Sequence, residues 1–191
     1  IGGSEYIELY NRSVKALPIS TLSWAVRKSD GTLNTRYSLS AVTELLEAGS
    51  FLLLSKNIES VTSFYDIFNP SALWQIPKLP VLANTASTLV LFRTADGVVI
   101  DEVSYSSKWH SYAIKNEKGV ALARINPDME TQSKTNWTSA AASVGYGTPG
   151  YQNSQYLKDR DEISTGIEKP IWIEETGRYN IVYRLDRAGY R

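Results

Sequence analysis

The side chains best suited to catalysis gather in one short segment, in which Asp101-Glu102 precedes Lys108-Trp109-His110. His110 is the only histidine and cysteine is absent. A Ser-His-Asp triad would therefore have to use His110, while thiol nucleophiles, disulfides and zinc sites with cysteine or several histidines are excluded. No Gly-x-Ser-x-Gly motif accompanies His110. Adjacent strand residues point to opposite faces, so Asp101 and Glu102 cannot act as a carboxylate pair. We therefore expect a protein that is not an enzyme.

Two loops resemble ligand-binding motifs but lack residues that such sites need. Residues 126–130 offer oxygen atoms without the Asp-x-Asp-x-Asp-Gly spacing that encloses calcium. Residues 145–150 lack the Lys-Ser/Thr pair and the helix start of a phosphate loop. We expect no metal and no cofactor. The Asn-x-Ser/Thr triplets at Asn11 and Asn136 are glycosylation acceptors only in a secretory setting.

Aromatic side chains in predicted loops are the best candidates for binding. An aromatic ring can stack on a sugar ring or anchor a protein interface. The alternative for each ring is packing onto the fold. The candidate ligand or partner surface consists of Trp74, Trp109, His110, Tyr112, Tyr146 and Tyr151, with Trp137 as a further loop aromatic.

The composition is that of an ordinary globular chain without a strongly charged partner. The 191 residues include 20 basic and 20 acidic side chains, and the sequence pI is about 6.8. Nucleic acids and anionic membrane surfaces need clustered Lys and Arg, and no such cluster occurs. The longest apolar runs are far below the roughly 20 residues that span a bilayer. We expect neither a nucleic-acid partner nor a membrane span.

The elements that position these residues are predicted to be short strands. Residues 5–10 alternate, with Ile7 and Leu9 on one face and Glu8 on the other. Glu5 and Glu8 are three positions apart and therefore point to opposite faces of this strand. A buried Glu5 would need Arg124 or backbone N–H donors as its partner. Asp-Gly pairs favour two tight hairpins, and an apolar run predicts a strand covered on both faces. The hairpins join residues 24–28 to 32–39 and 89–93 to 98–105, the apolar strand lies at 49–55, and a further strand lies at 120–125.

Helix is predicted to be minor. Residues 40–47 begin with a capping Ser40 and stop at Gly49, which predicts about two helical turns. Residues 57–68 predict a second short helix, ended by Asn69-Pro70. Seven short strands with turn-like breaks indicate an all-β fold, a β-sandwich with one or two short helices in its connecting loops.

A boundary is predicted near Tyr156 because the charge density changes there. Charged residues account for 26 of the 156 residues in 1–156 but for 14 of the 35 residues in 157–191. The start of the second part has no apolar periodicity and reads as a solvated linker or a surface helix turn. We expect one domain over residues 1–156, followed by a charged linker and partial strands.

Several separated motifs resemble a lamin tail domain of the bacterial type. The resemblance covers about residues 4–156 and implies an immunoglobulin-like β-sandwich that serves as a non-catalytic attachment and interaction module. Relatives begin with a further strand, where this chain has only Ile1-Gly2-Gly3-Ser4. The motifs are residues 5–11 with Leu17-Pro18-Ile19-Ser20 and Trp24, residues 82–84, 89–91 and 97–101 with Val103, Tyr105 and Trp109, and then residues 119–125, 136–140, 147–150 and Asn153-Ser154.

The end of the chain resembles the start of a small bacterial immunoglobulin-like domain, at residues 179–190. Two-stranded ribbons are marginal in water, so residues 171–185 are expected to need a pairing partner. The sheet edge without its usual first strand is one candidate, in the same molecule or in a strand-exchange homodimer.

The expected function is that of an interaction or attachment module in an exported or envelope-associated bacterial protein, in the periplasm, on the cell surface or secreted. Its partner would be a protein or a cell-surface polysaccharide. Two alternatives are a carbohydrate-binding or adhesive module that uses loop aromatics, and an accessory domain of a larger hydrolase. Fold alone does not choose among them.

Overall fold

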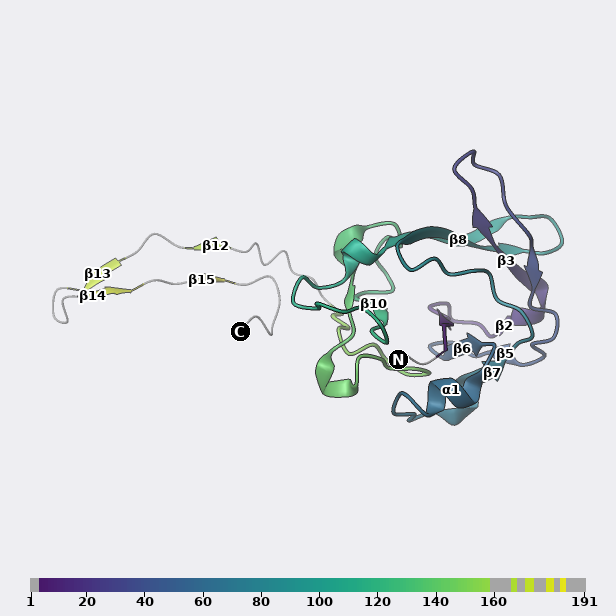
Figure 1. Cartoon of the computed structure of the whole chain (residues 1–191), viewed down its shortest axis with the longest axis horizontal. Coiled ribbons are helices and arrows are strands. Elements are labelled where there is room, and N and C mark those ends of the chain that lie inside the picture. Colours follow the sequence, from purple (N-terminus) through teal and green to yellow (C-terminus); the bar gives the residue numbers. More distant parts are fainter. Residues whose placement is uncertain (1–3, 159–165, 168–170, 174–177, 181–182, 185–191) are drawn as a thin grey trace. The chain divides into compact units, whose positions relative to one another are not determined.

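The computed structural model describes residues 4–158, 166–167, 171–173, 178–180 and 183–184 (Figure 1). The chain divides into two compact units, Ile1–Tyr156 and Leu157–Arg191. The first unit is all-β with very little helix, as the short strand runs predict. Its strands form several sheets, of which the two largest carry most of the apolar core.

The larger sheet has four strands in the order β4-β3-β8-β9. The bounds are β3 (Leu22–Arg27), β4 (Tyr37–Ser38), β8 (Ala86–Arg93) and β9 (Val99–Ser106). Both predicted hairpins are confirmed, because β3 pairs antiparallel with β4 and β8 with β9. The turns use the left-handed backbone that Asp-Gly favours, with φ of 82° at Gly31 and 74° at Gly97.

The smaller sheet has the order β1-β6-β7. β1 (Tyr6–Tyr10) runs antiparallel to β6 (Phe51–Ser55), whereas β7 (Leu73–Gln75) runs parallel to β6. A parallel neighbour needs a crossover, and this one contains α1 (Ile58–Thr62) and the 3-10 turn η2 (Pro70–Ala72). The second predicted helix is therefore confirmed as a shorter one, capped by Asn57, whose side chain accepts from the Ser60 N–H.

One apolar cluster joins the two sheets. Trp24 and Leu89 enter it from the four-stranded sheet and Leu52 and Leu54 from the three-stranded sheet. Figure 1 shows β3 and β8 on one side and β6 and β7 on the other. Complete burial of one such side chain stabilises the fold by about 1.5–3 kcal/mol. The strand at 49–55 is buried on both faces as predicted, since Leu53 packs away from this cluster against α1.

The predicted helix over residues 40–47 is wrong. This segment makes a turn and then β5 (Leu45–Leu46), which pairs antiparallel with β2 (Leu17–Pro18). The buried Asn11 side chain donates to the Leu46 carbonyl oxygen at 2.8 Å. An isolated two-turn helix is marginal in water, so burial of Val42 and Leu46 in the core decides the conformation.

The remaining short elements close the first unit beside the two sheets. The predicted strand at 120–125 is confirmed over three residues, paired antiparallel with a second short strand. These elements are η1 (Ile19–Thr21), η3 (Ser107–Trp109), β10 (Leu122–Arg124), η4 (Lys134–Asn136), β11 (Trp137–Ser139) and η5 (Ala142–Val144).

In the second unit the described strands pair with one another. β12 (Gly166–Ile167) pairs with β15 (Tyr183–Arg184), and β13 (Ile171–Ile173) pairs with β14 (Arg178–Asn180), both antiparallel. Within residues 171–185, β13 and β14 therefore form a two-stranded ribbon, while β15 pairs with β12, which precedes this range. The further partner expected for this ribbon stays a prediction. The predicted linker at residues 159–165 lies outside the described residues.

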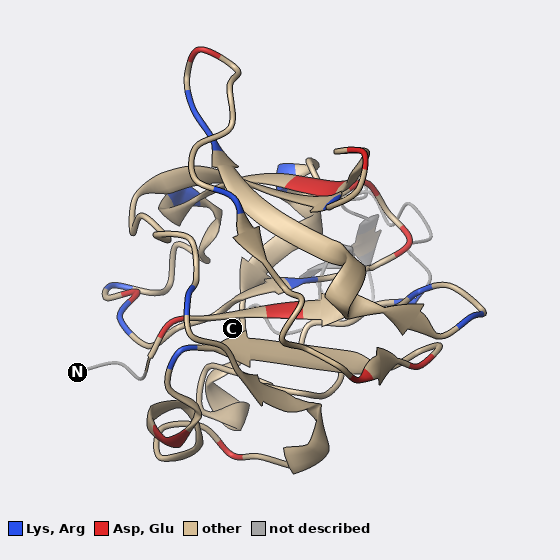
Figure 2. Cartoon of the chain, turned by 90° about the vertical axis from the view of Figure 1, so that its right-hand side faces the viewer, with Lys and Arg blue, Asp and Glu red and all other residues tan. Residues whose placement is uncertain are grey.

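Basic and acidic residues are interspersed along the ribbon of the described chain (Figure 2). Some are paired, as in Arg27–Glu102 at 2.6 Å and Arg93–Asp96 at 2.5 Å. Within the part of the chain that is described, no helix is both long and apolar enough to cross a bilayer.

Candidate binding site

The predicted surface residues lie in several places rather than one. Trp109 and His110 lie close to Trp137 and its neighbours. Trp74 belongs to β7, and Tyr151 packs against Phe68. Tyr112 is 84% exposed and Tyr146 is 37% exposed. The aromatic side chains therefore do not form a single continuous surface.

His110 is held by a serine that the sequence did not single out. Its Nδ1 lies 2.9 Å from Ser139 Oγ, and the Ser111 N–H donates to the same oxygen at 3.0 Å. Ser139 is only 5% exposed. A nucleophile must reach its substrate and its base must be oriented by a third group, whereas this buried hydroxyl bridges the ring and the backbone. Partial burial lowers the pKa of His110, and the charge of Glu117 opposes that shift.

Trp109 and Trp137 pack as a tilted pair with their ring centroids 6.1 Å apart. The Trp137 Nε1–H donates to the Thr131 carbonyl oxygen at 2.8 Å, and the Arg124 guanidinium lies 6.0 Å from the Trp137 ring. Arg124 also bonds to Asp101 and so does not pair with Glu5, which is exposed. With these contacts Trp109 and Trp137 pack onto the fold, which is the alternative that the sequence analysis gave to a role in ligand binding.

Tyr151 lies beside a carboxyl group in an unusual environment. Glu8 Oε2 accepts from the Gly150 N–H at 2.6 Å, and its charge acts on Tyr6 and Tyr151. Burial raises the pKa of Glu8 to about 8, and the Gly150 hydrogen bond opposes the shift. Alternation placed Glu8 opposite the core residues of β1, but it did not reveal that a distant loop covers this face.

Both asparagines of the glycosylation triplets are buried. Asn11 is 2% exposed and Asn136 is 0% exposed. The Asn136 amide donates to the Asn126 carbonyl oxygen at 2.9 Å, while its own carbonyl accepts from the Asn126 N–H. Neither side chain is accessible to a transferase in the folded protein, so both have structural roles.

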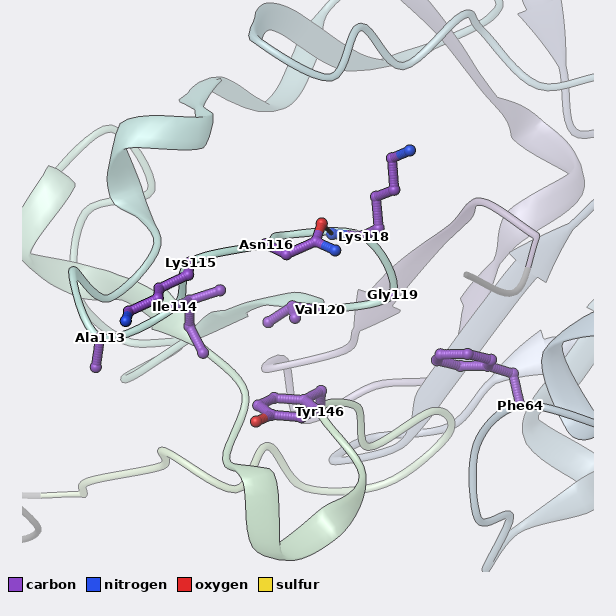
Figure 3. Close-up of a pocket in the computed structure, with 9 residues that line it drawn as sticks. All are labelled: Phe64, Ala113, Ile114, Lys115, Asn116, Lys118, Gly119, Val120 and Tyr146. Carbon is purple, nitrogen blue, oxygen red and sulfur yellow. Dashed lines mark hydrogen bonds between the residues drawn. The ribbon is translucent and has the colours of Figure 1, made fainter. Parts of the chain in front are cut away.

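A broad recess lies around Tyr146 and is called here the Tyr146 recess (Figure 3). It has a volume of about 500 Å³ and opens broadly to solvent. Its walls come from three parts of the chain: the segment after α1, the loop before β10, and the turn after η5. The lining residues are Phe64, Ala113, Ile114, Lys115, Asn116, Lys118, Gly119, Val120 and Tyr146.

Tyr146 holds its position through a left-handed backbone. Its φ is 67°, the only positive value at a described residue other than glycine. The Tyr146 N–H donates to Ala141 and its carbonyl accepts from the Ala121 N–H, at 3.0 and 2.9 Å. A non-glycine residue in this region costs about 1–2 kcal/mol, and such residues are frequent at functional sites. The strained turn presents the phenol ring to the recess.

The polar side of the recess is cationic. Lys115 and Lys118 are exposed, and neither forms an ion pair with a described residue. Asn116 Oδ1 accepts from the Lys118 N–H at 3.2 Å, which leaves its amide N–H groups available to a ligand. This segment was not predicted as a site, because its Lys-Asn-Glu-Lys-Gly run is that of an ordinary polar turn. It becomes a candidate only through its position beside Tyr146 and Phe64.

No group of three metal-ligating side chains occurs among the described residues. Comparison of the sequence with models of known protein families and with curated proteins finds no match.

Proposed function

We propose that the protein is a non-catalytic interaction module of an exported or envelope-associated protein, built as an immunoglobulin-like β-sandwich of the lamin tail type. Two sheets that share one apolar cluster support the sandwich. The ordered motifs from residues 5–11 to Asn153-Ser154 support the family.

The Tyr146 recess is the observation that carries the binding role. It combines two partly exposed rings, Phe64 and Tyr146, with the Asn116 amide and with two lysines that form no ion pair with a described residue. Aromatic anchors beside polar groups that complement a partner are typical of interaction surfaces. His110, by contrast, is engaged with the buried Ser139.

Capture from an envelope extract tests this proposal. The full chain is the bait, and bound proteins and glycans are identified together. Tyr146→Gly removes the ring but keeps a residue that accepts φ of 67°, and Lys115→Gln with Lys118→Gln removes the charges. We expect both variants to lose the specific partner, whereas Lys134→Gln, an exposed lysine outside the recess, retains it. Equal capture by all variants would show that the Tyr146 recess is not the docking site.

A carbohydrate-binding role is the second candidate, favoured by the exposed Tyr146 ring beside the free Asn116 amide. Sugar rings stack on aromatic faces while amides bond their hydroxyl groups. Isothermal titration with envelope polysaccharides distinguishes the two candidates, since a glycan ligand would bind in the absence of any protein partner. An accessory role beside a hydrolase domain is compatible with either.

A further inference from the structure

A second, smaller cavity lies between β5, β6 and β7 and is called here the Trp74 cavity. It has a volume of about 170 Å³ and is more enclosed than the Tyr146 recess. Its apolar floor includes Leu46 and Leu52, both 5% exposed. Its rim carries Glu44 and Glu47, on the two sides of β5. Neither the Tyr146 recess nor the packed tryptophan pair uses these residues.

Trp74 gives the cavity an aromatic wall in a fixed position. Its backbone is in register with Leu54 on the central strand β6, which is fully buried. The ring is partly buried against the core cluster to which Leu46 and Leu52 belong. Trp74 is also one of the residues that line the cavity. A tryptophan face is the strongest of the aromatic side chains in attracting a cation.

The charges at the rim have one sign. Glu44 and Glu47 are exposed, and neither forms an ion pair with a described residue. Among the described residues, the one hydrogen bond to a rim carboxylate is long, from the Thr43 hydroxyl to Glu44 Oε2 at 3.4 Å. No lysine or arginine lines the cavity. Two carboxylates without cations beside an aromatic face complement a positive group.

The volume of the Trp74 cavity and the groups that line it limit the class of ligand that it can bind. Two carboxylates do not make a metal site, and no group of three metal-ligating side chains is present among residues 4–158. An apolar floor suits methylene groups, and the rim suits a terminal ammonium or guanidinium. This combination matches the amphipathic side chain of lysine or arginine. The cavity has room for one such side chain rather than for a polymer.

We propose that the Trp74 cavity receives a single lysine or arginine side chain of a protein partner, with its stem on Leu46 and Leu52 and its charge between Trp74, Glu44 and Glu47. This goes beyond the proposed function, because it assigns a different pocket with the opposite charge preference from the Tyr146 recess.

Titration of the isotopically labelled full chain, observed by nuclear magnetic resonance, tests the proposal directly. The indole N–H signal of Trp74, identified by its loss in Trp74→Phe, reports on the cavity. The probe is N-acetyl-lysine methylamide, and N-acetyl-norleucine methylamide is the uncharged match with the same stem. We expect the lysine probe to shift the Trp74 signal at millimolar concentration and the norleucine probe to bind at least about tenfold more weakly.

Glu44→Gln combined with Glu47→Gln is the matching change in the protein. We expect about a tenfold or greater loss of affinity for the lysine probe, because two charge-assisted contacts become neutral. Glu130→Gln, which removes an exposed carboxylate outside the cavity, should have no effect. Added salt should weaken the interaction in the unaltered protein.

Three results would overturn this assignment: equal shifts with both probes, unchanged affinity in the double variant, or no Trp74 response at all. Tyr146→Gly separates it from the proposed function, since this variant should bind the lysine probe normally. If the lysine probe shifts the Trp74 signal while the Tyr146-recess variants capture partners normally, the Trp74 cavity binds lysine and the proposed function of the Tyr146 recess is wrong.

Discussion

At the scale of single residues, Glu8 shows how a carboxyl group can lower stability near neutral pH. Its pKa is about 8 in the folded protein against 4.5 for the free side chain. The unfolded chain releases its proton first, so stability falls as pH rises through this window and then levels off. The neighbouring Tyr6 and Tyr151 supply no positive charge that would offset the burial.

Glu8→Gln should therefore make the protein more stable at pH 8, by roughly 1–4 kcal/mol, with the gain shrinking toward pH 4.5. The amide oxygen can still accept from the Gly150 N–H. Urea unfolding of both proteins from pH 5 to 8 measures the difference, in which the contribution of His110 cancels. Parallel stability curves would refute the assignment of a raised pKa, and Glu130→Gln serves as the surface control.

Tyr146 allows its backbone and its ring to be tested separately. Tyr146→Gly relieves the strain of the left-handed backbone but increases the conformational entropy of the unfolded chain. The two effects oppose each other, so the free energy of unfolding should stay within about 1 kcal/mol of the original. Tyr146→Val should destabilise by about 1–3 kcal/mol, because a β-branched residue tolerates φ of 67° poorly. Chemical denaturation of the two variants checks this order, and a less stable glycine variant would contradict it.

At the scale of elements, Asn11 connects β1 to the segment that carries Glu44 and Glu47. Its amide donates to the Lys15 and Leu46 carbonyl oxygens at 2.7 and 2.8 Å. Its own carbonyl accepts from the Ser13 N–H at 3.0 Å. The Asn11 side chain thus bonds to three backbone groups, two in the turn after β1 and one in β5.

Asn11→Ala should destabilise the protein by about 2–4 kcal/mol, because buried backbone groups lose their partners. It should also weaken lysine binding in the Trp74 cavity, since β5 loses an anchor. Asn116→Ala changes an exposed asparagine whose side chain accepts one hydrogen bond, from the Lys118 N–H, and should change stability by less than about 1 kcal/mol. Thermal unfolding compares the two, and equal losses would show that Asn11 is not a structural hub.

At the scale of the whole molecule, the core clusters and strand pairs each lie within one of the two units. We therefore expect residues 1–156 to fold alone with the cooperative transition of a single domain. Calorimetry of this fragment and of the full chain measures it, and a fragment that does not unfold cooperatively would contradict it. Sedimentation of the full chain, in the same samples, tests the strand-exchange homodimer expected from the sequence.

Local sequence patterns predicted the elements whose stability is mainly local. The Asp-Gly turns at Gly31 and Gly97, the alternation of Ile7 with Leu9, and the apolar strand around Leu53 all follow from backbone preference and periodicity. The same patterns indicated the all-β class. They work because each depends on residues a few positions apart.

Tertiary contacts decided the rest. Residues 40–47 have helix signals, yet pairing with β2 and the Asn11 bond to Leu46 place β5 there. Glu8 is covered by a loop 142 positions away, and the Tyr146 recess combines Phe64 with the loop at 113–120. By itself the sequence determined the tight Asp-Gly turns and the strands with clear alternation or a continuous apolar run. Which polar side chains are buried, and which aromatics border a cavity, depended on contacts between distant segments that no local spacing encodes.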